Sequence, residues 1–537
     1  MPSLRVNAFC VCLLLALLSA NSAHSQGKKS AAKDIDAATV AAYEKLGESH
    51  GWLLKGDIFG FGFLPTRENE KKLLPGFCFK TFPKAKLPEV TVPFGLDLQD
   101  TKVTDAELKD LAALKNLSWL DLRNTKVTDA GLTELARLKK LTMLAVDGTN
   151  VTDASLRTMR ESGLLHALCR VYGKGNRPSD RPKSVEEVYH LDLRDTQVTD
   201  AGLRELGSLK NLTYIDLTRA KVTDKGLKDL VGFKNLTSLH LFGTMVTEAG
   251  LKELAGLKNL TTLQLSHVTD SHLRVLREIG LLHALSDAYG PDEFGMANGR
   301  PKSSEDVLRL ELGGTHVTDA GLKELVGLKN LSRLRLGGSG LLGGRKVTDA
   351  GLSDLAALKN LTWLDLGETE VTDAGLKELV GLKKLSRLVL YGTKVMGSGL
   401  KDLVSLENLA ELDLRFTKVT DAGLKNFAGV KNLAVLRLGG TKVTGAGLSD
   451  LTAIKNLKWL DLDHTEVTDE QLKELAGFKN LNWLYLENTK VTDAGLKELV
   501  GLKNLTSLNL YRTKVTEAGV VELEKTLPKC KIYRSGR

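Results

Sequence analysis

The chain has 537 residues, with 75 Lys and Arg against 66 Asp and Glu, and a net charge of +9 when histidine is neutral. Its 42% hydrophobic and 26% charged content is typical of a folded protein and excludes a globally disordered chain. The excess positive charge is spread over the whole length without a local basic patch, so nucleic acid is excluded as the expected partner.

The first 25 residues have the features of a secretory signal peptide. Arg5 supplies a positive charge, residues 8–20 form a 13-residue apolar run, and Ala23 and Ser25 place small side chains before a cleavage site. The run is too short to cross a hydrocarbon core of roughly 30 Å as a helix. The sequence therefore predicts a mature chain without a transmembrane segment, secreted or otherwise outside the cytoplasm, in the periplasm or at the cell surface. Retention of residues 1–25 as an uncleaved anchor is the alternative.

Residues 26–93 are rich in aromatic residues and proline, and they begin with a helical pattern over Asp34–Gly47. They precede a long repeat array whose first unit would otherwise expose apolar side chains to water. We expect residues 26–93 to form an N-terminal cap and residues 526–537 to close the other end.

A unit of mostly 24 residues fills the chain from residue 94 to residue 525. The leucines of one unit cannot be buried within that unit, so neighbouring units must stack into one elongated body. The most regular part of the unit is Val-Thr-Asp, or a close variant, which occurs sixteen times, with the valine at 103, 127, 151, 198, 222, 246, 268, 317, 347, 371, 395, 419, 443, 467, 491 and 515.

Each unit contains two hydrophobic periods. Leu120 and Leu122 alternate with other residue types, which predicts a short strand, and leucines at every third position of residues 132–138 predict one face of a short helix. Thr128 stands at the expected N-cap, and Asp129 lies in the first turn, where the helix dipole favours a negative charge. The unit is thus predicted to run strand, turn, helix and return.

Two units support this register of the helix start. Glu107 and Gln471 follow Thr104 and Thr468 by three residues, as in a capping box. The glycine of the unit, such as Gly131, is expected to let helix and strand pack closely.

The unit resembles the leucine-rich repeat family, whose signature is L-x-x-L-x-L-x-x-N/C-x-L. The resemblance implies an α/β solenoid of horseshoe shape, with one parallel concave sheet of about sixteen strands and short convex helices. The V-T-D-x-G-L-x-x-L portion is similar to the cysteine-containing repeats of F-box proteins and to the 24-residue repeats of secreted bacterial proteins. Threonine, whose hydroxyl is expected to bond the turn backbone, takes the Asn or Cys position of the signature, for example at Thr101, Thr125, Thr149, Thr196 and Thr369.

Two long inserts interrupt the array, at about residues 154–188 and 271–307, and they are copies of each other. Both contain the segment R-E-x-G-L-L-H-A-L and later R-P-K-S, so a block of about five units was duplicated together with its insert. Each insert is predicted to be an extended helix, a polar loop and a second short helix. Residues 338–345 are rich in glycine and predict a projecting loop.

An asparagine recurs at the expected exit from the helix, where Asn tolerates a left-handed backbone. In a eukaryotic secretory pathway the same tripeptides, Asn-Leu-Thr or Asn-Leu-Ser, would be glycosylation acceptors. They begin at Asn116, Asn211, Asn235, Asn259, Asn330, Asn360 and Asn504.

The residues between and beside the strand leucines are expected to face the concave side. Adjacent strands are about 4.8 Å apart, so Trp459 and Trp483 are predicted neighbours, while Trp119 shares their repeat position far from them. Large aromatic side chains beside charged ones favour a binding surface, although aromatic stacking that only stiffens the sheet is the alternative. The predicted ligand-binding residues are Trp459, Trp483, Tyr485, Tyr511, Asp461, Trp363 and Tyr391.

Aspartate stands between the strand leucines at 97, 121, 192, 216, 365, 413 and 461. We expect solvated carboxylates there, with Arg alongside, and no catalytic residues, because side chains encoded by a repeat seldom converge as an active site must. The ten histidines show no metal-ligand spacing, and no Gly-rich phosphate loop follows a strand. No metal and no cofactor are predicted.

These features predict a non-enzymatic protein that binds a protein or a cell-envelope polymer on its concave face. The Lys-rich helices are expected to make the convex side basic, which would attract anionic polymers. One alternative is a structural envelope scaffold without a defined ligand. The other, from the F-box resemblance, is the substrate-recognition arm of a ubiquitin-ligase-like complex, which would need a cytoplasmic chain.

Overall fold

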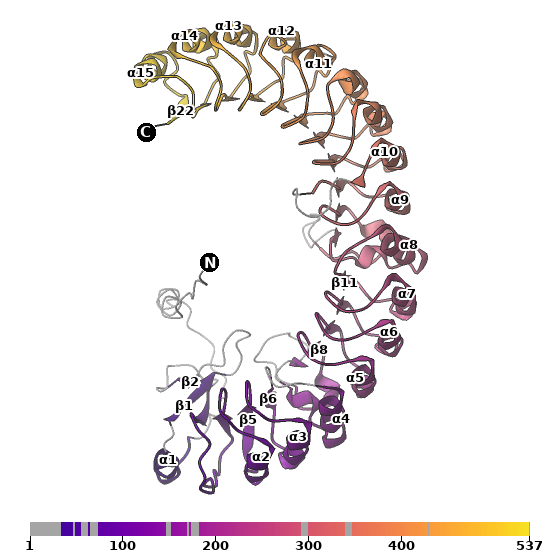
Figure 1. The fold of residues 1–537 in the computed structure, drawn as a ribbon, viewed down its shortest axis with the longest axis vertical. Helices are drawn as coiled ribbons and strands as arrows, with labels where there is room; N and C mark the ends of the chain where they lie inside the picture. Colours follow the sequence, from indigo (N-terminus) through magenta and orange to yellow (C-terminus); the bar gives the residue numbers. More distant parts are fainter. Residues whose placement is uncertain are drawn as a thin grey trace, which may run out of the picture.

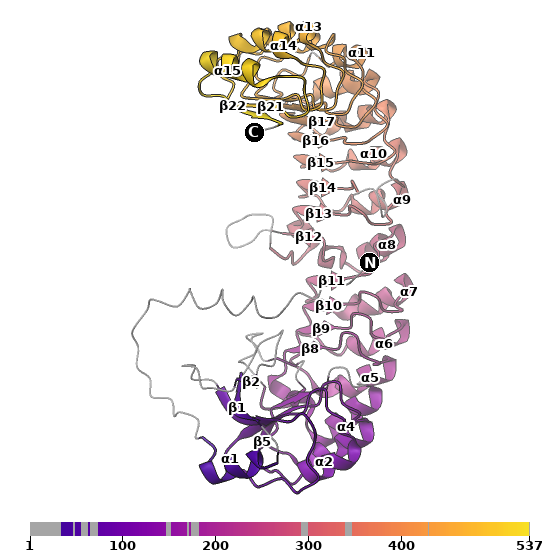
Figure 2. The ribbon, with the colours of Figure 1, turned by 60° about the vertical axis from the view of Figure 1, so that its left-hand side comes forward.

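The computed structural model describes residues 34–46, 49–54, 63–64, 73–146, 152–168, 171–172, 182–290, 299–338, 346–427 and 429–535. The predicted signal peptide, most of the polar loop of each insert and residues 339–345 lie outside the described residues. The repeats form the predicted α/β horseshoe, with strands along the concave side and helices along the convex side (Figure 1). Turned by 60°, the strands lie one above another along the inner face (Figure 2).

The repeat strands are three to five residues long, because only the short alternating stretch around the paired leucines is extended. They are β4 (Phe94–Asp97), β5 (Leu117–Asp121), β6 (Met143–Ala145), β8 (His190–Asp192), β9 (Tyr214–Asp216), β10 (Ser238–His240), β11 (Thr262–Gln264), β13 (Arg309–Glu311), β14 (Arg333–Arg335), β15 (Trp363–Asp365), β16 (Arg387–Val389), β17 (Glu411–Asp413), β18 (Val435–Arg437), β19 (Trp459–Asp461), β20 (Trp483–Tyr485) and β21 (Ser507–Leu510).

These sixteen strands do not form the single sheet that the sequence predicts. They are divided among a sheet that ends at β6, a five-stranded sheet β7 to β11 and an eleven-stranded sheet β12 to β22. The breaks fall at the inserts, where two short strands, β7 (Val171–Tyr172) and β12 (Ala288–Tyr289), pair antiparallel with β8 and β13. Each insert thus contributes one antiparallel strand at the start of the sheet that follows it.

The convex helices span four to ten residues, and the predicted short helices are confirmed. In two repeats the convex segment is a 3₁₀ helix, η11 (Asp373–Gly381) and η12 (Ser398–Ser405). The α-helices of the solenoid are α2 (Asp105–Leu111), α3 (Asp129–Glu134), α4 (Asp153–Ser162), α5 (Asp200–Glu205), α6 (Asp224–Leu230), α7 (Glu248–Leu251), α8 (Asp270–Glu278), α9 (Asp319–Leu322), α10 (Asp349–Leu355), α11 (Asp421–Lys425), α12 (Leu448–Leu451), α13 (Asp469–Leu472), α14 (Asp493–Leu496) and α15 (Glu517–Thr526).

Both ends of the array are covered. At the N-terminal end, α1 (Ala37–Glu44), β1 (Ser49–Leu54), β2 (Phe63–Leu64) and β3 (Leu73–Cys78) precede the first repeat, and β3 runs parallel to β4. Tyr43 of α1 stacks on Phe77 of β3 with ring centroids 3.8 Å apart. At the other end, β22 (Lys531–Arg534) adds a parallel strand to β21. One continuous hydrophobic core runs from Ile35 to Ile532, so the inserts interrupt the sheet but not the core.

A hydrogen-bond ladder joins consecutive convex helices. At most helix N-caps, a threonine donates from its backbone N–H and its hydroxyl to the two carboxylate oxygens of the first-turn aspartate of the preceding repeat. In the pair Thr372–Asp349 these distances are 2.8 and 2.6 Å. We call this series the Asp–Thr ladder; it also includes Thr128–Asp105, Thr199–Asp153, Thr223–Asp200, Thr247–Asp224, Thr318–Asp270, Thr348–Asp319, Thr492–Asp469 and Thr516–Asp493.

The ladder explains where the predicted capping boxes fall. Thr104 and Thr468 receive no aspartate from a preceding repeat, because one starts the array and the other follows Gly445. Their own Glu107 and Gln471 accept the backbone N–H instead, at 2.8 and 3.2 Å. In these two repeats the capping box therefore replaces the Thr–Asp hydrogen-bonded pair that the ladder lacks there.

The repeat glycine packs against this ladder and not, as predicted, against a strand. A Cβ on Gly131 would lie 2.3 Å from Oδ1 of Asp105 and 2.9 Å from Leu108 in the preceding helix. The glycine keeps the space that the incoming carboxylate needs, and at the self-capped helix starts Glu107 and Gln471 stand in its place.

The prediction of a left-handed backbone at the helix-exit asparagines is wrong. None of these seven described residues has a positive φ, which occurs instead just before the strand-exit threonine, as at Asn124 and Asn488. The seven side-chain amides each donate to a backbone carbonyl in the preceding coil of the solenoid, for example Asn360 to Lys329 O at 2.9 Å. The hydroxyl of the strand-exit threonine bonds the turn as expected, and Thr369 Oγ1 donates to Leu366 O at 2.6 Å.

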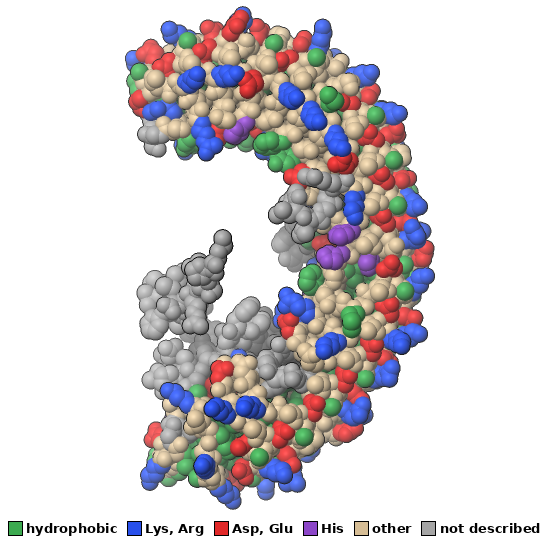
Figure 3. All heavy atoms as spheres, in the orientation of Figure 1, with side chains coloured by type: hydrophobic (Ala, Val, Ile, Leu, Met, Phe, Trp, Pro, Cys, Tyr) green, Lys and Arg blue, Asp and Glu red, His purple; other side chains and the backbone are tan. Residues whose placement is uncertain are grey.

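The convex side carries both signs of charge, which corrects the expectation of a basic surface. Figure 3 shows acidic side chains interspersed among Lys and Arg along the outer edge. Pairs between neighbouring helices contribute, such as Arg204 with Asp229 at 3.3 Å and Lys228 with Glu253 at 3.7 Å. A general attraction of this side to anionic polymers is therefore not supported.

Candidate functional site

The concave side chains of the eleven-stranded sheet lie in rows across the strands, because the repeat strands pair in register. The residue before the central leucine forms one row, which runs from β13 to β22 through Arg309, Arg333, Trp363, Arg387, Glu411, Val435, Trp459, Trp483, Ser507 and Lys531. The residue after that leucine forms the second row, through Glu311, Arg335, Asp365, Val389, Asp413, Arg437, Asp461, Tyr485, Asn509 and Tyr533.

Trp459, Trp483 and Tyr485 form what we call the C-terminal aromatic patch. The two indole rings have centroids 5.5 Å apart at an interplanar angle of 31°, and the Tyr485 ring lies 5.2 Å from Trp459. Trp483 keeps 37% of its surface exposed, while Trp459 and Tyr485 are half-buried. Three large rings thus present a rigid apolar surface on the concave side of the solenoid.

A charged layer surrounds this patch. The Arg437 guanidinium lies 5.4 Å from the Trp459 ring centroid, and the buried Asp461 accepts a hydrogen bond from the Asp463 N–H at 3.0 Å. Burial, together with the nearby charge of Asp461, raises the pKa of Asp463 to about 7. Burial and the same two carboxylates raise the pKa of Tyr485. The charge of Asp463, beside the patch, therefore changes near neutral pH.

The other predicted site residues do not join this patch. Tyr511 lies on the next repeat, is 42% exposed, and makes no aromatic contact with the patch among the described residues. Tyr391 packs edge-on against Phe416 at 5.3 Å, with Arg415 over its ring at 5.7 Å. Trp363 lies on β15, four strands from Trp459. The predicted set is thus divided into separate groups along the arc.

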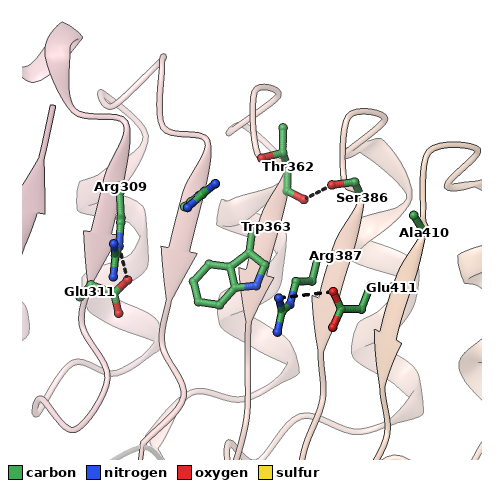
Figure 4. A pocket seen from close by; sticks show the side chains of 9 residues that line it. Arg309, Glu311, Thr362, Trp363, Ser386, Arg387, Ala410 and Glu411 are labelled. Atoms are coloured by element: carbon green, nitrogen blue, oxygen red, sulfur yellow. Dashed lines mark hydrogen bonds and ion pairs between the residues drawn. The ribbon is translucent and has the colours of Figure 1, made fainter. Parts of the chain in front are cut away.

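Trp363 belongs to a second concave feature, which we call the arginine hollow (Figure 4). Its volume is about 470 Å³, within the range of small ligand sites. The sequence shows these arginines at a shared repeat position, but that signal alone does not group them into a site. The hollow is lined by Arg309, Glu311, Arg333, Thr362, Trp363, Ser386, Arg387, Ala410 and Glu411.

The aspartates between the strand leucines are not the solvated carboxylates that the sequence predicts. Asp121, Asp413 and Asp461 are at most 5% exposed, because the side chains of neighbouring strands crowd them on the inside of the curve. Their carboxylates accept the backbone N–H two residues on, as Asp121 does from Arg123 at 2.9 Å. Arg123 and Arg415 also pair with the aspartates two residues before them. These carboxylates therefore fix the backbone where the strand ends.

Trp119 is also unavailable as a concave binding residue. It is only 4% exposed and packs with Leu74 of β3 and Met143 of β6. The N-terminal strands therefore use this tryptophan as core.

A polar cluster occupies the concave face of the five-stranded sheet. Ser238 Oγ lies 3.3 Å from His240 Nε2, and His240 Nδ1 lies 3.5 Å from Asp216 Oδ2. Tyr214 also donates to Asp216 Oδ2, at 3.2 Å. Burial raises the pKa of Asp216, but hydrogen bonds from His240 and Thr218 outweigh burial and lower it to about 2. These contacts join the side chains of β9 and β10 across the concave face of this sheet.

Neither a metal centre nor a membrane span stands out in the described ranges. No group of three or more His, Cys, Asp or Glu side chains there is arranged to hold a metal ion. No helix there is both long and apolar enough to cross a membrane.

The stacked strand–turn–helix units and their concave sheet define a leucine-rich repeat solenoid. Three segments, residues 189–207, 208–231 and 405–428, match the model of the leucine-rich repeat family, and the fold is that of a leucine-rich repeat solenoid. No curated protein matches the chain.

Solved structures with a similar fold come from several sources. An internalin of Listeria monocytogenes is 19% identical over 62% of this chain and 83% of its own, with a TM-score of 0.34. A leucine-rich repeat protein of Leptospira interrogans is 22% identical over 80% of this chain and 98% of its own, with a TM-score of 0.46. A plant peptide hormone receptor, RGFR1, in complex with RGF2, is 16% identical over 87% and 82%, with a TM-score of 0.40.

Proposed function

We propose that this protein is an exported, non-enzymatic binding protein that holds a protein partner against the C-terminal aromatic patch. The observation that carries this proposal is the cluster of Trp459, Trp483 and Tyr485, with Trp483 37% exposed on the concave side. Rigid aromatic side chains bury a large area at little cost in conformational entropy, which is why they dominate binding hot spots. Leucine-rich repeats typically bind proteins.

Export is supported by the sequence of residues 1–25, with its positive start, short apolar run and small residues before Gln26. Expression of the full chain, followed by cell fractionation and N-terminal sequencing, tests this part of the proposal. We expect a mature chain that begins near Gln26 outside the cytoplasm. Recovery of an intact Met1 in the cytoplasm would contradict export and would favour the ligase-type alternative.

A capture experiment with two variants tests the binding surface. Residues 26–537, their Trp459→Ala/Trp483→Ala variant and a Phe242→Ala control are immobilised and exposed to an extracytoplasmic extract. Phe242 is a matched control, because it is an aromatic side chain 39% exposed beside the last residues of β10 in another sheet. We expect a protein retained by the parent and the control but lost by the double variant.

Circular dichroism must first show that all three proteins are folded. Equal retention by all three would contradict the aromatic patch as the binding surface. Loose retention that salt removes equally from all three would favour a scaffold without a defined ligand.

A further inference from the structure

The arginine hollow contains one guanidinium whose charge is not balanced. Arg309 Nε donates to Glu311 Oε1 at 2.7 Å, and Arg387 pairs with Glu411 at 3.3 Å. Arg333 lies between Arg309 and Trp363 in the same row, is exposed, and has no ion-pair partner among the described residues. The carboxylate on the adjacent strand, Glu311 of β13, is already paired with Arg309 and also lies 3.8 Å from Arg335.

The arrangement of side chains around Trp363 indicates which chemical group the arginine hollow suits. The Arg387 guanidinium lies 5.9 Å from the Trp363 ring centroid, so it covers one face of the indole ring. Figure 4 shows Arg387 and the Trp363 ring side by side over adjacent strands, with Glu411 beyond them. The exposed planar guanidinium of Arg333 suits a carboxylate, which it can bind with two parallel hydrogen bonds.

The two glutamates limit how much negative charge the ligand can carry. Glu311 and Glu411 line the hollow on either side of Arg333 along the sheet, on β13 and β17. Both are already paired with arginines, so the positive charge left over in the hollow is that of Arg333, which matches a single carboxylate. A peptide segment supplies charges that are separated along an extended backbone, with alternate side chains on the same side.

We infer that the arginine hollow is the subsite for an acidic side chain of a bound peptide segment, with the Asp or Glu carboxylate of the partner paired to Arg333. The inference rests on the proposed function, since it assigns to the bound protein an acidic segment that lies along the concave rows. Trp363 and the methylene groups of Arg387 form the apolar wall of this subsite.

The test measures fluorescence anisotropy with a defined probe on the mature chain. The probe is a fluorescein-labelled ten-residue peptide of alternating Glu and Gly, and its neutral counterpart has Gln in place of Glu. We expect the Glu peptide to bind and the Arg333→Gln variant to weaken its binding about tenfold, as expected for loss of a charge-assisted pair. Arg512→Gln removes one exposed positive charge elsewhere along the arc and should leave the affinity within about twofold.

Three results would overturn this assignment: no binding of the Glu peptide, equal affinity for the Glu and Gln peptides, or equal effects of the Arg333 and Arg512 substitutions. Tighter binding of polygalacturonate than of the Glu peptide, lost in Arg333→Gln, would show an acidic glycan site and would also overturn it. The Trp459→Ala/Trp483→Ala variant should keep its affinity for the probe. A failure of the aromatic patch is thereby distinguishable from a failure of the hollow.

Discussion

Asp463 shows how the position of a single side chain changes its chemistry on the concave surface. It follows β19, where the sheet curves inward, and lies close to Asp461 and to the backbone of Glu487. The adjacency of Trp459 and Trp483 followed from the 24-residue spacing alone. The raised pKa of Asp463 could not be predicted in the same way, because it depends on burial and on carboxylates from two strands.

Replacement of Asp463 by Asn should change the pH dependence of stability. The pKa of this carboxyl is raised from 3.8 to about 7 in the folded chain, so the folded state binds the proton more tightly. The stabilisation from this group is fully present below about pH 4 and is lost as the pH rises through 7. We expect Asp463→Asn to be more stable than the parent by about 1–2 kcal/mol at pH 8, with a smaller difference at pH 5.

Urea denaturation at both pH values measures this difference. Asp110→Asn is the control, since Asp110 is exposed on α2 and away from the concave face. An equal stability change at pH 5 and pH 8 for Asp463→Asn would refute the assignment of the raised pKa to this residue.

The convex helices show which parts of an element a repeat sequence can reveal. The threonine N-cap and the first-turn aspartate were both predicted, and Thr372 is an N-cap whose side chain accepts from Ala374 N–H. The larger role of the aspartate was missed, because its partner is the threonine of the next repeat, 23 residues further along the chain. A local pattern identifies a cap, but only stacking shows which helix supplies the carboxylate.

A methyl group on the repeat glycine should break one rung of the Asp–Thr ladder. A Cβ on Gly375 would lie 2.3 Å from Asp349 Oδ1, so this carboxylate would have to release Thr372. We expect Gly375→Ala to destabilise the protein by about 2 kcal/mol, although alanine favours helix by about 1 kcal/mol. Gly327→Ala, where a Cβ would meet open space, should be neutral within about 0.5 kcal/mol. Thermal unfolding of both variants distinguishes the clash from a general effect of alanine.

At the scale of the whole molecule, the horseshoe with its concave strands was predictable, since leucines repeated every 24 residues have few other ways to be buried. The division into three sheets was not, because it depends on the two-residue strands β7 and β12, which are too short to give a periodic signal. The core and the Asp–Thr ladder nevertheless cross both inserts, through Thr199–Asp153 and Thr318–Asp270. On the strand side, the isolated parallel bridges Leu144–Leu168 and Leu263–Leu285 also join the repeats to the inserts at these breaks.

Removal of the rung at the second insert should loosen the junction between two sheets. Thr318 donates to Asp270 at 2.8 Å from its N–H and 2.6 Å from its hydroxyl, across 48 residues of sequence. We expect Asp270→Ala to accelerate amide hydrogen exchange in β11 and β13, with β19 and β20 unchanged, because each repeat contacts mainly its neighbours. Exchange measured by mass spectrometry would contradict this picture if it rose uniformly along the chain or did not change.

The Asp–Thr ladder also bears on how this chain could have reached its present length. Most repeats offer an aspartate on one side and a threonine on the other, so most units can follow one another and still find a complement. Recombination that adds or removes whole units then produces a foldable protein without compensating substitutions, and the duplicated block that carries an insert is a record of such an event. Among the exceptions are the self-capped starts at Thr104 and Thr468. A crossover that joined either of them to a repeat with a first-turn aspartate would bring Glu107 or Gln471 against the incoming carboxylate. Recombination at these two helix starts should therefore be disfavoured.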